Sequence, residues 1–219
     1  MQDIITVNHL SKSYGSHQVL NDISFSFQPG QIIALLGPNG SGKSSLIKIL
    51  TGLIHDYSGE VLIDGEVPGP STKAKIAYLP EKSYLADWMR AIDAINYIAD
   101  FYPDFDRDKA MRMLDTFGLQ PKQKIKSMSK GMQEKLQLIL VMSRAAKLYL
   151  LDEPIGGVDP ATRDYILRTI IGNYNPDAAV LISTHLIADV EPVLDDVIFI
   201  DRGHIALTAS VDYIREEKG

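Results

Sequence analysis

The first third of the chain has the polarity pattern of short β-strands. Apolar and β-branched residues occur in brief runs separated by polar residues and glycine, and the turn residues Tyr14, Gly15 and Ser16 divide the first two runs. The run at residues 31–36 is almost continuously apolar and ends in a glycine-rich turn, which is typical of a buried strand followed by a helix. The strands expected here are residues 4–7, 23–27, 31–36, 59–63 and 75–79, with a helix at about 43–51.

The middle of the chain changes to helical periodicity. Pro103, Gly118 and Pro121 divide this part into separate pieces. The helices expected here are residues 91–101, 107–117 and 129–146. Because they stand between strand patterns, we expect a helical subdomain inserted into a sheet domain at about residues 82–146.

The last third alternates strand and helix. Such alternation is typical of a parallel sheet with helices packed on it. The expected elements are strands 148–151, 179–183 and 197–200 and helices 161–171 and 186–190. No repeat, low-complexity tract or linker interrupts the pattern, so we expect one α/β domain over residues 1–219 with a mainly parallel core sheet and a frayed end at residues 215–219.

The composition excludes some function classes. The chain has 219 residues, of which 45% are hydrophobic and 23% charged, with a formal net charge of -6. Such an acidic balance argues against a large basic surface, so no nucleic-acid partner is expected. The absence of cysteine excludes disulfides and thiolate metal sites. We find no signal-peptide pattern and no apolar run near the roughly 20 residues of a membrane helix, so any membrane-spanning part is expected on another polypeptide.

Residues 37–44 fit the pattern G-x-x-x-x-G-K-[ST] of a phosphate-binding loop. The glycines allow the backbone to curl so that several N–H groups face one anion, and a helix that begins near Lys43 adds its N-terminal dipole. Lys43 would reach the β- and γ-phosphates, and Ser44 would bind Mg²⁺. The preceding strand and following helix favour this interpretation over a chance match in a glycine turn.

Two acidic residues end the strand expected at residues 148–151. Asp152 and Glu153 would lie at the carboxyl edge of the parallel sheet, where such folds bind ligands. Beside a phosphate loop, Asp152 would orient Mg²⁺ or its water and Glu153 would polarise an attacking water. Taken alone, the pair is equally compatible with a strand end that simply turns polar and meets water.

At this point the chain resembles the ATP-binding cassette (ABC) ATPase family over nearly its whole length. Tyr14 matches the aromatic residue that stacks on adenine, and residues 128–133 lie where the family has its signature before a helix. Residues 156–159 match the loop after the catalytic glutamate, and His185 matches the switch histidine. Each motif alone is weak, but their shared order around two stronger motifs is specific. The resemblance implies a P-loop NTPase fold with an N-terminal antiparallel β subdomain.

Two departures from the family pattern concern the signature and the lid. Lys130 replaces a glycine and Met132 a glutamine, whereas Ser129 and Gly131 are kept; this variant looks like that of bacterial drug and peptide exporter ATPases. Glu81 stands where the lid glutamine is expected, and an ionised carboxylate there cannot donate a hydrogen bond. Glu81 can still reach Mg²⁺ or its water.

The resemblance implies a set of roles for individual residues. Glu153 and His185 are the expected catalytic residues, and Ser44, Asp152 and Glu81 the expected metal ligands. Residues expected to bind ATP are Tyr14, Asn39, Gly40, Ser41, Gly42, Lys43, Ser44, Ser45, Ser129 and Gly131. The last two would complete the site of a second domain, because two such domains are implied to meet head to tail around ATP, with Asp159 at their interface.

The resemblance further implies a motor subunit at the cytoplasmic face of the cell membrane that powers export through a transmembrane permease on a separate chain. Residues 84–89 combine apolar and aromatic groups that either dock on that permease or are covered by the domain's own helices. A homodimer and a heterodimer of ATPase domains are equally compatible with the motifs. The alternatives are a non-transport ABC ATPase and a regulatory nucleotide-binding subunit with low turnover. The altered signature is the only feature that favours the regulatory subunit, and the presence of both Glu153 and His185 argues against it.

Overall fold

Two β-sheets organise the chain, and the computed structural model describes residues 2–156 and 159–218. The smaller sheet is antiparallel, with strand order β2-β1-β4. The larger sheet has the order β5-β6-β7-β3-β8-β9, in which β9 alone runs antiparallel to its neighbour. The strands are β1 Ile5–Tyr14, β2 His17–Phe27, β3 Ile32–Leu36, β4 Ser58–Ile63, β5 Ile76–Leu79, β6 Leu148–Asp152, β7 Ala179–Thr184, β8 Asp196–Asp201 and β9 His204–Ser210. This arrangement confirms the expected α/β fold with an antiparallel N-terminal sheet and a mainly parallel core sheet.

The central strands β3, β6 and β7 are buried along their whole length because both faces of the sheet are covered. Side chains alternate between the faces. Ile33 and Leu35 pack in one core with helix α1 and the antiparallel sheet, whereas Ile32, Ala34 and Leu36 pack in the other core with α5 and α6. The near-continuous apolar runs in the sequence therefore reflect two cores on one sheet.

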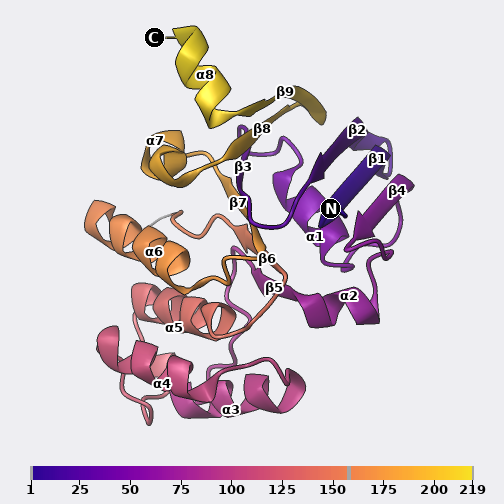
Figure 1. Ribbon diagram of the computed structural model, residues 1–219. Coiled ribbons are helices and arrows are strands. Elements are labelled where there is room, and N and C mark those ends of the chain that lie inside the picture. Colours follow the sequence, from indigo (N-terminus) through magenta and orange to yellow (C-terminus); the bar gives the residue numbers. More distant parts are fainter. Residues whose placement is uncertain (1, 157–158, 219) are drawn as a thin grey trace.

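Three helices of the middle segment lie together at one end of the molecule, between β5 and β6 in chain order (Figure 1). Arg144, at the end of this segment, ties it to the sheet domain. The side chain of Arg144 is 5% exposed and bonds the Asp104 carboxylate at 2.8 Å and the carbonyls of Ala74 and Ile76. These helices are α3 Ala91–Phe101, α4 Arg107–Thr116 and α5 Lys130–Met142.

The remaining helices cover the sheets or close the chain. They are α1 Lys43–Leu50, α2 Pro70–Lys75, α6 Pro160–Asn173, α7 Ile187–Val190 and α8 Val211–Lys218, with 3-10 turns at Ile125–Ser127 and Glu191–Val193. Two expectations were wrong at helix ends: α5 stops at Met142 rather than at residue 146, and residues 215–218 continue α8 instead of fraying. Across the described ranges, we find no helix whose length and apolar content would let it cross a bilayer.

Candidate functional site

A cleft of about 900 Å³ opens at the carboxyl edge of the parallel sheet. The strand register brings the carboxyl ends of β3, β6 and β7 side by side. Leu36 of β3 pairs Thr184 of β7, and Asp152 of β6 pairs Ser183 of β7. The loops after β3, β5, β6 and β7 therefore meet there, and the N-terminal half of α5 forms the opposite wall. We call this hollow the main cleft.

The loop after β3 forms a glycine-shaped cradle at the start of α1. Gly42 caps the helix with φ 110°, and a Cβ there would lie 2.6 Å from Leu20 Cδ2 and 2.8 Å from the Val19 carbonyl oxygen. A Cβ on Gly37 would lie 2.2 Å from the carbonyl oxygen of Ile200. Glycine is thus required at both positions. The first N–H groups of α1 have no partner inside the helix, which makes its start a site for an anion.

Lys43 lies in this cradle with its ammonium group directed along the loop. Its side chain is 6% exposed, and Nζ donates to the carbonyl oxygens of Gly37 at 2.8 Å and Pro38 at 3.2 Å. The hydroxyl of Ser41 is buried and has no hydrogen-bond partner within the described part of the chain. A buried cation and an unsatisfied hydroxyl in one loop fit a ligand with several acceptor oxygens.

Asp152 is 2% exposed and is held by two hydroxyl groups. Ser183 Oγ donates to its Oδ1 at 2.6 Å, and Ser44 Oγ donates to the same oxygen at 3.2 Å. The arrangement fixes the carboxylate beside the start of α1. The hydroxyl and carboxylate of the Ser44–Asp152 pair are oxygen donors of the kind that Mg²⁺ prefers.

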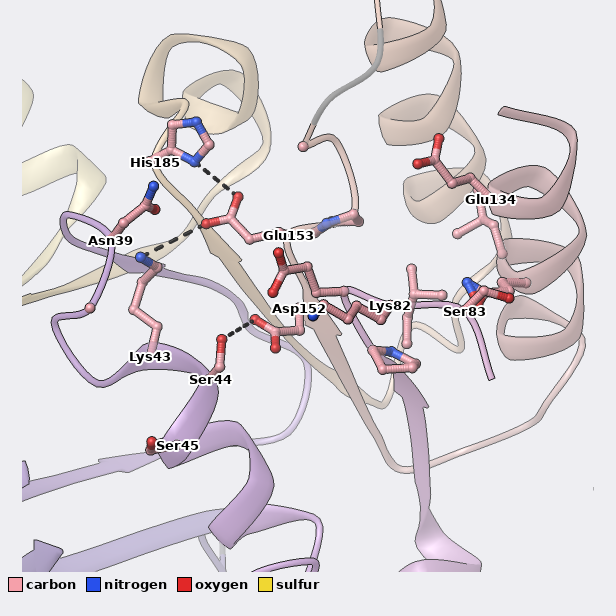
Figure 2. A pocket seen from close by; sticks show the side chains of 18 of the residues that line it. Asn39, Lys43, Ser44, Ser45, Lys82, Ser83, Glu134, Asp152, Glu153 and His185 are labelled. Carbon is pink, nitrogen blue, oxygen red and sulfur yellow. Dashed lines mark hydrogen bonds and ion pairs between the residues drawn. The ribbon is translucent and has the colours of Figure 1, made fainter. Parts of the chain in front are cut away.

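Glu153 connects the phosphate loop to His185, as Figure 2 shows. Its Oε1 lies 3.8 Å from Lys43 Nζ and its Oε2 lies 3.1 Å from His185 Nδ1. The backbone of Glu153 has φ 51°, an uncommon value for a residue with a side chain, and it is held by bonds from its N–H to the carbonyl oxygen and Oγ of Ser183. Strain of this kind persists where the surroundings fix the conformation, and it is concentrated at functional sites.

Burial shifts the pKa values of two groups near the main cleft. Burial, with smaller contributions from the charges of Asp152 and Glu81, raises the pKa of Tyr78 to about 12, so this group stays protonated at neutral pH. Across the cleft on α5, burial raises the pKa of Glu134 above its ordinary value. Glu81 also lines the cleft, and its predicted role toward the metal stays a prediction.

The comparisons with known proteins identify the family. The family model described as ABC transporter matches residues 20–156. The chain belongs to the ABC transporter family. It is 30% identical to the ABC transporter ATP-binding protein YtrB of Bacillus subtilis over 217 residues, which is 98% of this chain and 74% of that protein. It is 31% identical to the lantibiotic transport ATP-binding protein SrtF of Streptococcus pyogenes, over 95% of this chain and 92% of that protein.

A solved structure, "Structure of ATP binding subunit of ABC transporter", superimposes with a TM-score of 0.87 at 29% identity. It covers 99% of this chain and 93% of its own. Members of the ABC family are ATPases, so the chain is an ATP-binding and ATP-hydrolysing subunit, as the motifs predicted. The family works with a transmembrane subunit, and its ATPase domains dimerise.

The structure brings most of the ABC site residues to one cleft. Those lining it are Asn39, Gly40, Gly42, Lys43, Ser44, Ser45, Glu81, Asp152, Glu153 and His185, and Ser41 lies within the same loop. No cluster of three or more His, Cys, Asp or Glu side chains with metal-site geometry occurs in residues 2–156 and 159–218. Ser44 and Asp152 as the protein's ligands still fit Mg²⁺, which usually keeps waters and takes further oxygens from phosphates.

Besides Ser41, the residues Tyr14, Ser129 and Gly131 expected at the ABC site lie outside this lining. Tyr14 ends β1 with its side chain 49% exposed, and the ammonium group of Lys12 lies 4.7 Å from its ring centroid. Ser129 caps α5, where its Oγ accepts from the Met132 N–H at 3.3 Å, and Gly131 follows in the first turn. The predicted roles of Tyr14 toward adenine and of Ser129 and Gly131 toward a second domain stay predictions.

The loop after Glu153 is described only in part. Gly157 and Val158, two residues of the predicted loop at 156–159, lie outside the described residues. Asp159 caps α6 and accepts hydrogen bonds from the N–H and Oγ1 of Thr162 at 3.1 and 2.6 Å. Its predicted position at a domain interface stays a prediction.

The sequence analysis missed Gln137 and His17, which line the main cleft, and Ser183, which lies outside its lining but bonds Asp152 and Glu153. Ser183 bridges Asp152 and Glu153, and its only signal is a polar residue that ends an apolar strand. Gln137 lines the cleft from α5, although helical periodicity alone places it in the core. His17, at the start of β2, also lines the cleft. Val19 on the same strand lies beside Gly42 of the phosphate loop. No sequence motif marks His17.

Proposed function

We propose that this chain binds MgATP in the main cleft and hydrolyses it to power export through a separate membrane subunit. The observation that carries the proposal is the position of Glu153, whose carboxylate lies between the ammonium of Lys43 and the imidazole of His185. Beside it, Ser44 and Asp152 offer two oxygen ligands. Phosphate cradle, metal ligands and a held carboxylate thus meet at one sheet edge, as phosphoryl transfer to water requires.

In the proposed mechanism, the phosphate loop and Lys43 hold the β- and γ-phosphates, and Lys43 exchanges its bonds to the loop carbonyls for phosphate oxygens. Bound Mg²⁺ supplies charge neutralisation between the phosphates. Asp152, fixed by Ser183, and Ser44 keep the ion in place. Glu153 accepts a hydrogen bond from the attacking water and orients it, and His185 holds the Glu153 carboxylate from the other side.

We further propose that two such domains act together. Ser129 caps an exposed helix start and does not line the cleft of its own chain. A second domain placed head to tail would receive the N–H groups and hydroxyl of that helix start at its γ-phosphate. Whether the second domain is an identical chain is decided by sizing the purified protein with ATP: a dimer supports a homodimer, and a monomer under turnover-blocking conditions points to a different partner chain.

Export is the proposed direction of transport. It is supported by the names of relatives at about 30% identity, which include the lantibiotic transport protein SrtF and the SkfA peptide export protein SkfE of Bacillus subtilis. The permease is proposed to contact residues 84–89, where Trp88 is 77% exposed and Tyr84 49% exposed. A membrane-peripheral location at the cytoplasmic face follows from this contact.

The proposal is tested by Mg²⁺-dependent ATP turnover of the purified chain and of Glu153→Gln. The amide keeps the size of the side chain but cannot act as a base, so turnover is expected to fall by about 10²–10⁴ while ATP affinity is kept. Glu191→Gln, a substitution of an exposed glutamate outside the cleft, serves as the matched control. Unchanged turnover in Glu153→Gln would remove Glu153 from the mechanism, and no ATP binding by the wild type would refute the function.

A further inference from the structure

One face of α5 is polar where it meets the main cleft. Lys130, Gln133, Glu134 and Gln137 follow one another at the i, i+3, i+4, i+7 spacing of a single helix face, and all four line the cleft. From Leu136 to Met142 the helix is buried, and Gln137 is the one polar residue in that stretch. Exposure falls along the stripe, from 79% for the Lys130 side chain to 3% for Gln137, so Gln137 is its buried end.

Three of these four side chains have partners within the chain. Lys130 Nζ lies 3.6 Å from Glu134 Oε1, and Gln133 Nε2 donates to the carbonyl oxygen of Ile125 at 3.2 Å. Gln137 differs: the residue is 3% exposed, and its Oε1 is buried with no hydrogen-bond partner in the described part of the chain. A buried amide oxygen without a partner destabilises the fold, so its presence in the wall of a binding cleft needs a reason.

Two carboxylates on the neighbouring strand ends line the same cleft as Gln137. Helix α5 packs on β5, and Leu79 at the end of β5 pairs Leu151, the residue before Asp152. Glu81 and Asp152 therefore follow neighbouring strand ends and line the same cleft as Gln137. Asp152 already accepts two hydroxyl hydrogen bonds. An ionised Glu81 can only accept hydrogen bonds, whereas an amide both donates and accepts.

We propose that Gln137 is a positioning residue of the ATPase site, which holds Glu81 and a water at the metal end of the nucleotide. Its Nε2 donates to the Glu81 carboxylate, and its Oε1 accepts from a water that enters with the nucleotide and its metal. The amide thereby fixes a carboxylate beside a polyanion without adding charge. The inference rests on the proposed function, because it assigns the unsatisfied oxygen a partner that is present only when MgATP is bound.

The test uses Gln137→Met in the full chain, a replacement of similar size without the amide. Without nucleotide, Tm is expected to rise by about 2–8 °C, because the unsatisfied oxygen is removed. ATP affinity in the presence of Mg²⁺ is expected to fall about tenfold, which is the loss of one hydrogen bond to a charged group, while affinity in EDTA stays unchanged. Gln28→Met is the control: it removes an amide outside the cleft that donates to Asp3 Oδ1 at 2.8 Å, so Tm does not rise and the Mg²⁺ effect is kept.

A double-mutant cycle then tests the link to Glu81. In a Glu81→Ala background, Gln137→Met is expected to have no further effect on Mg²⁺-dependent affinity. The inference is overturned if Tm falls in Gln137→Met, if the Mg²⁺-dependent affinity is unchanged, or if its loss persists in full without Glu81. A wild-type chain that shows no Mg²⁺-dependent ATP affinity would instead overturn the proposed function, and this result is seen before any variant is compared.

Discussion

Ser183 is the residue whose removal tests the geometry of the cleft most sharply. Its hydroxyl donates to Asp152 Oδ1 at 2.6 Å and accepts from the Glu153 N–H at 3.0 Å, and the residue is fully buried. Ser183→Ala removes a buried hydrogen bond to a charged group, which contributes about 1.5–3 kcal/mol. The Glu153 N–H keeps its bond to the Ser183 carbonyl at 3.1 Å, so that second loss is small.

For a chain of this size, such a loss corresponds to a fall in Tm of about 3–12 °C. The Mg²⁺ concentration for half-maximal ATP turnover should also rise, because Asp152 is then positioned only by Ser44 at 3.2 Å. Scanning calorimetry and a Mg²⁺ titration of turnover measure the two effects. Thr184→Val is the matched control: it removes a neighbouring buried hydroxyl that accepts from the Leu186 N–H and does not contact Asp152. If the Mg²⁺ concentration for half-maximal turnover is the same in Ser183→Ala and Thr184→Val, the assigned role of Ser183 is refuted.

Three further predictions follow from the packing. Gly42→Ala should abolish ATP binding in a calorimetric titration, because its Cβ would lie 2.8 Å from the Val19 carbonyl oxygen; binding at wild-type affinity would contradict the cradle. Arg144→Met should destabilise the chain to urea by about 3 kcal/mol, because it leaves the partly buried Asp104 carboxylate without its buried partner, whereas Arg112→Met, which removes an exposed pair, should change stability little. The pKa of Asp64 is lowered by hydrogen bonds from Lys75 and Lys147. This stabilisation is present above the ordinary carboxyl pKa and is lost as pH falls through the lowered one, so the Tm deficit of Lys75→Met at pH 7 should shrink below about pH 4.

The sequence predicted those parts of the fold that depend on local pattern. The apolar run at residues 31–36 became β3, and the helix expected from residue 43 begins there as α1. Elements with weak amphipathic patterns were missed: β9 is an exposed edge strand, and α2 is a short helix that starts at Pro70. The expected helix at 129–146 ended early because Arg144 leaves the helix to bond the carbonyls of residues 74 and 76, a contact distant in sequence.

The site divides in the same way. Lys43, Ser44 and Asp152 were predicted because each belongs to a contiguous motif, and the structure brings them to one cleft. Ser183 and Gln137 belong to no motif, since their roles depend on strand register and on which face of α5 meets the cleft. From the sequence pattern alone, Gln137 stands among apolar helix residues and is interpreted as part of the core.

ATP turnover by the purified chain, measured against protein concentration with and without Mg²⁺, tests the central claim most directly. Specific activity is expected to rise with concentration as two domains meet, to require Mg²⁺, and to fall by about 10²–10⁴ in Glu153→Gln. Mg²⁺-dependent turnover of Glu153→Gln equal to that of the wild type would contradict the assignment of Glu153 as the residue that orients the attacking water.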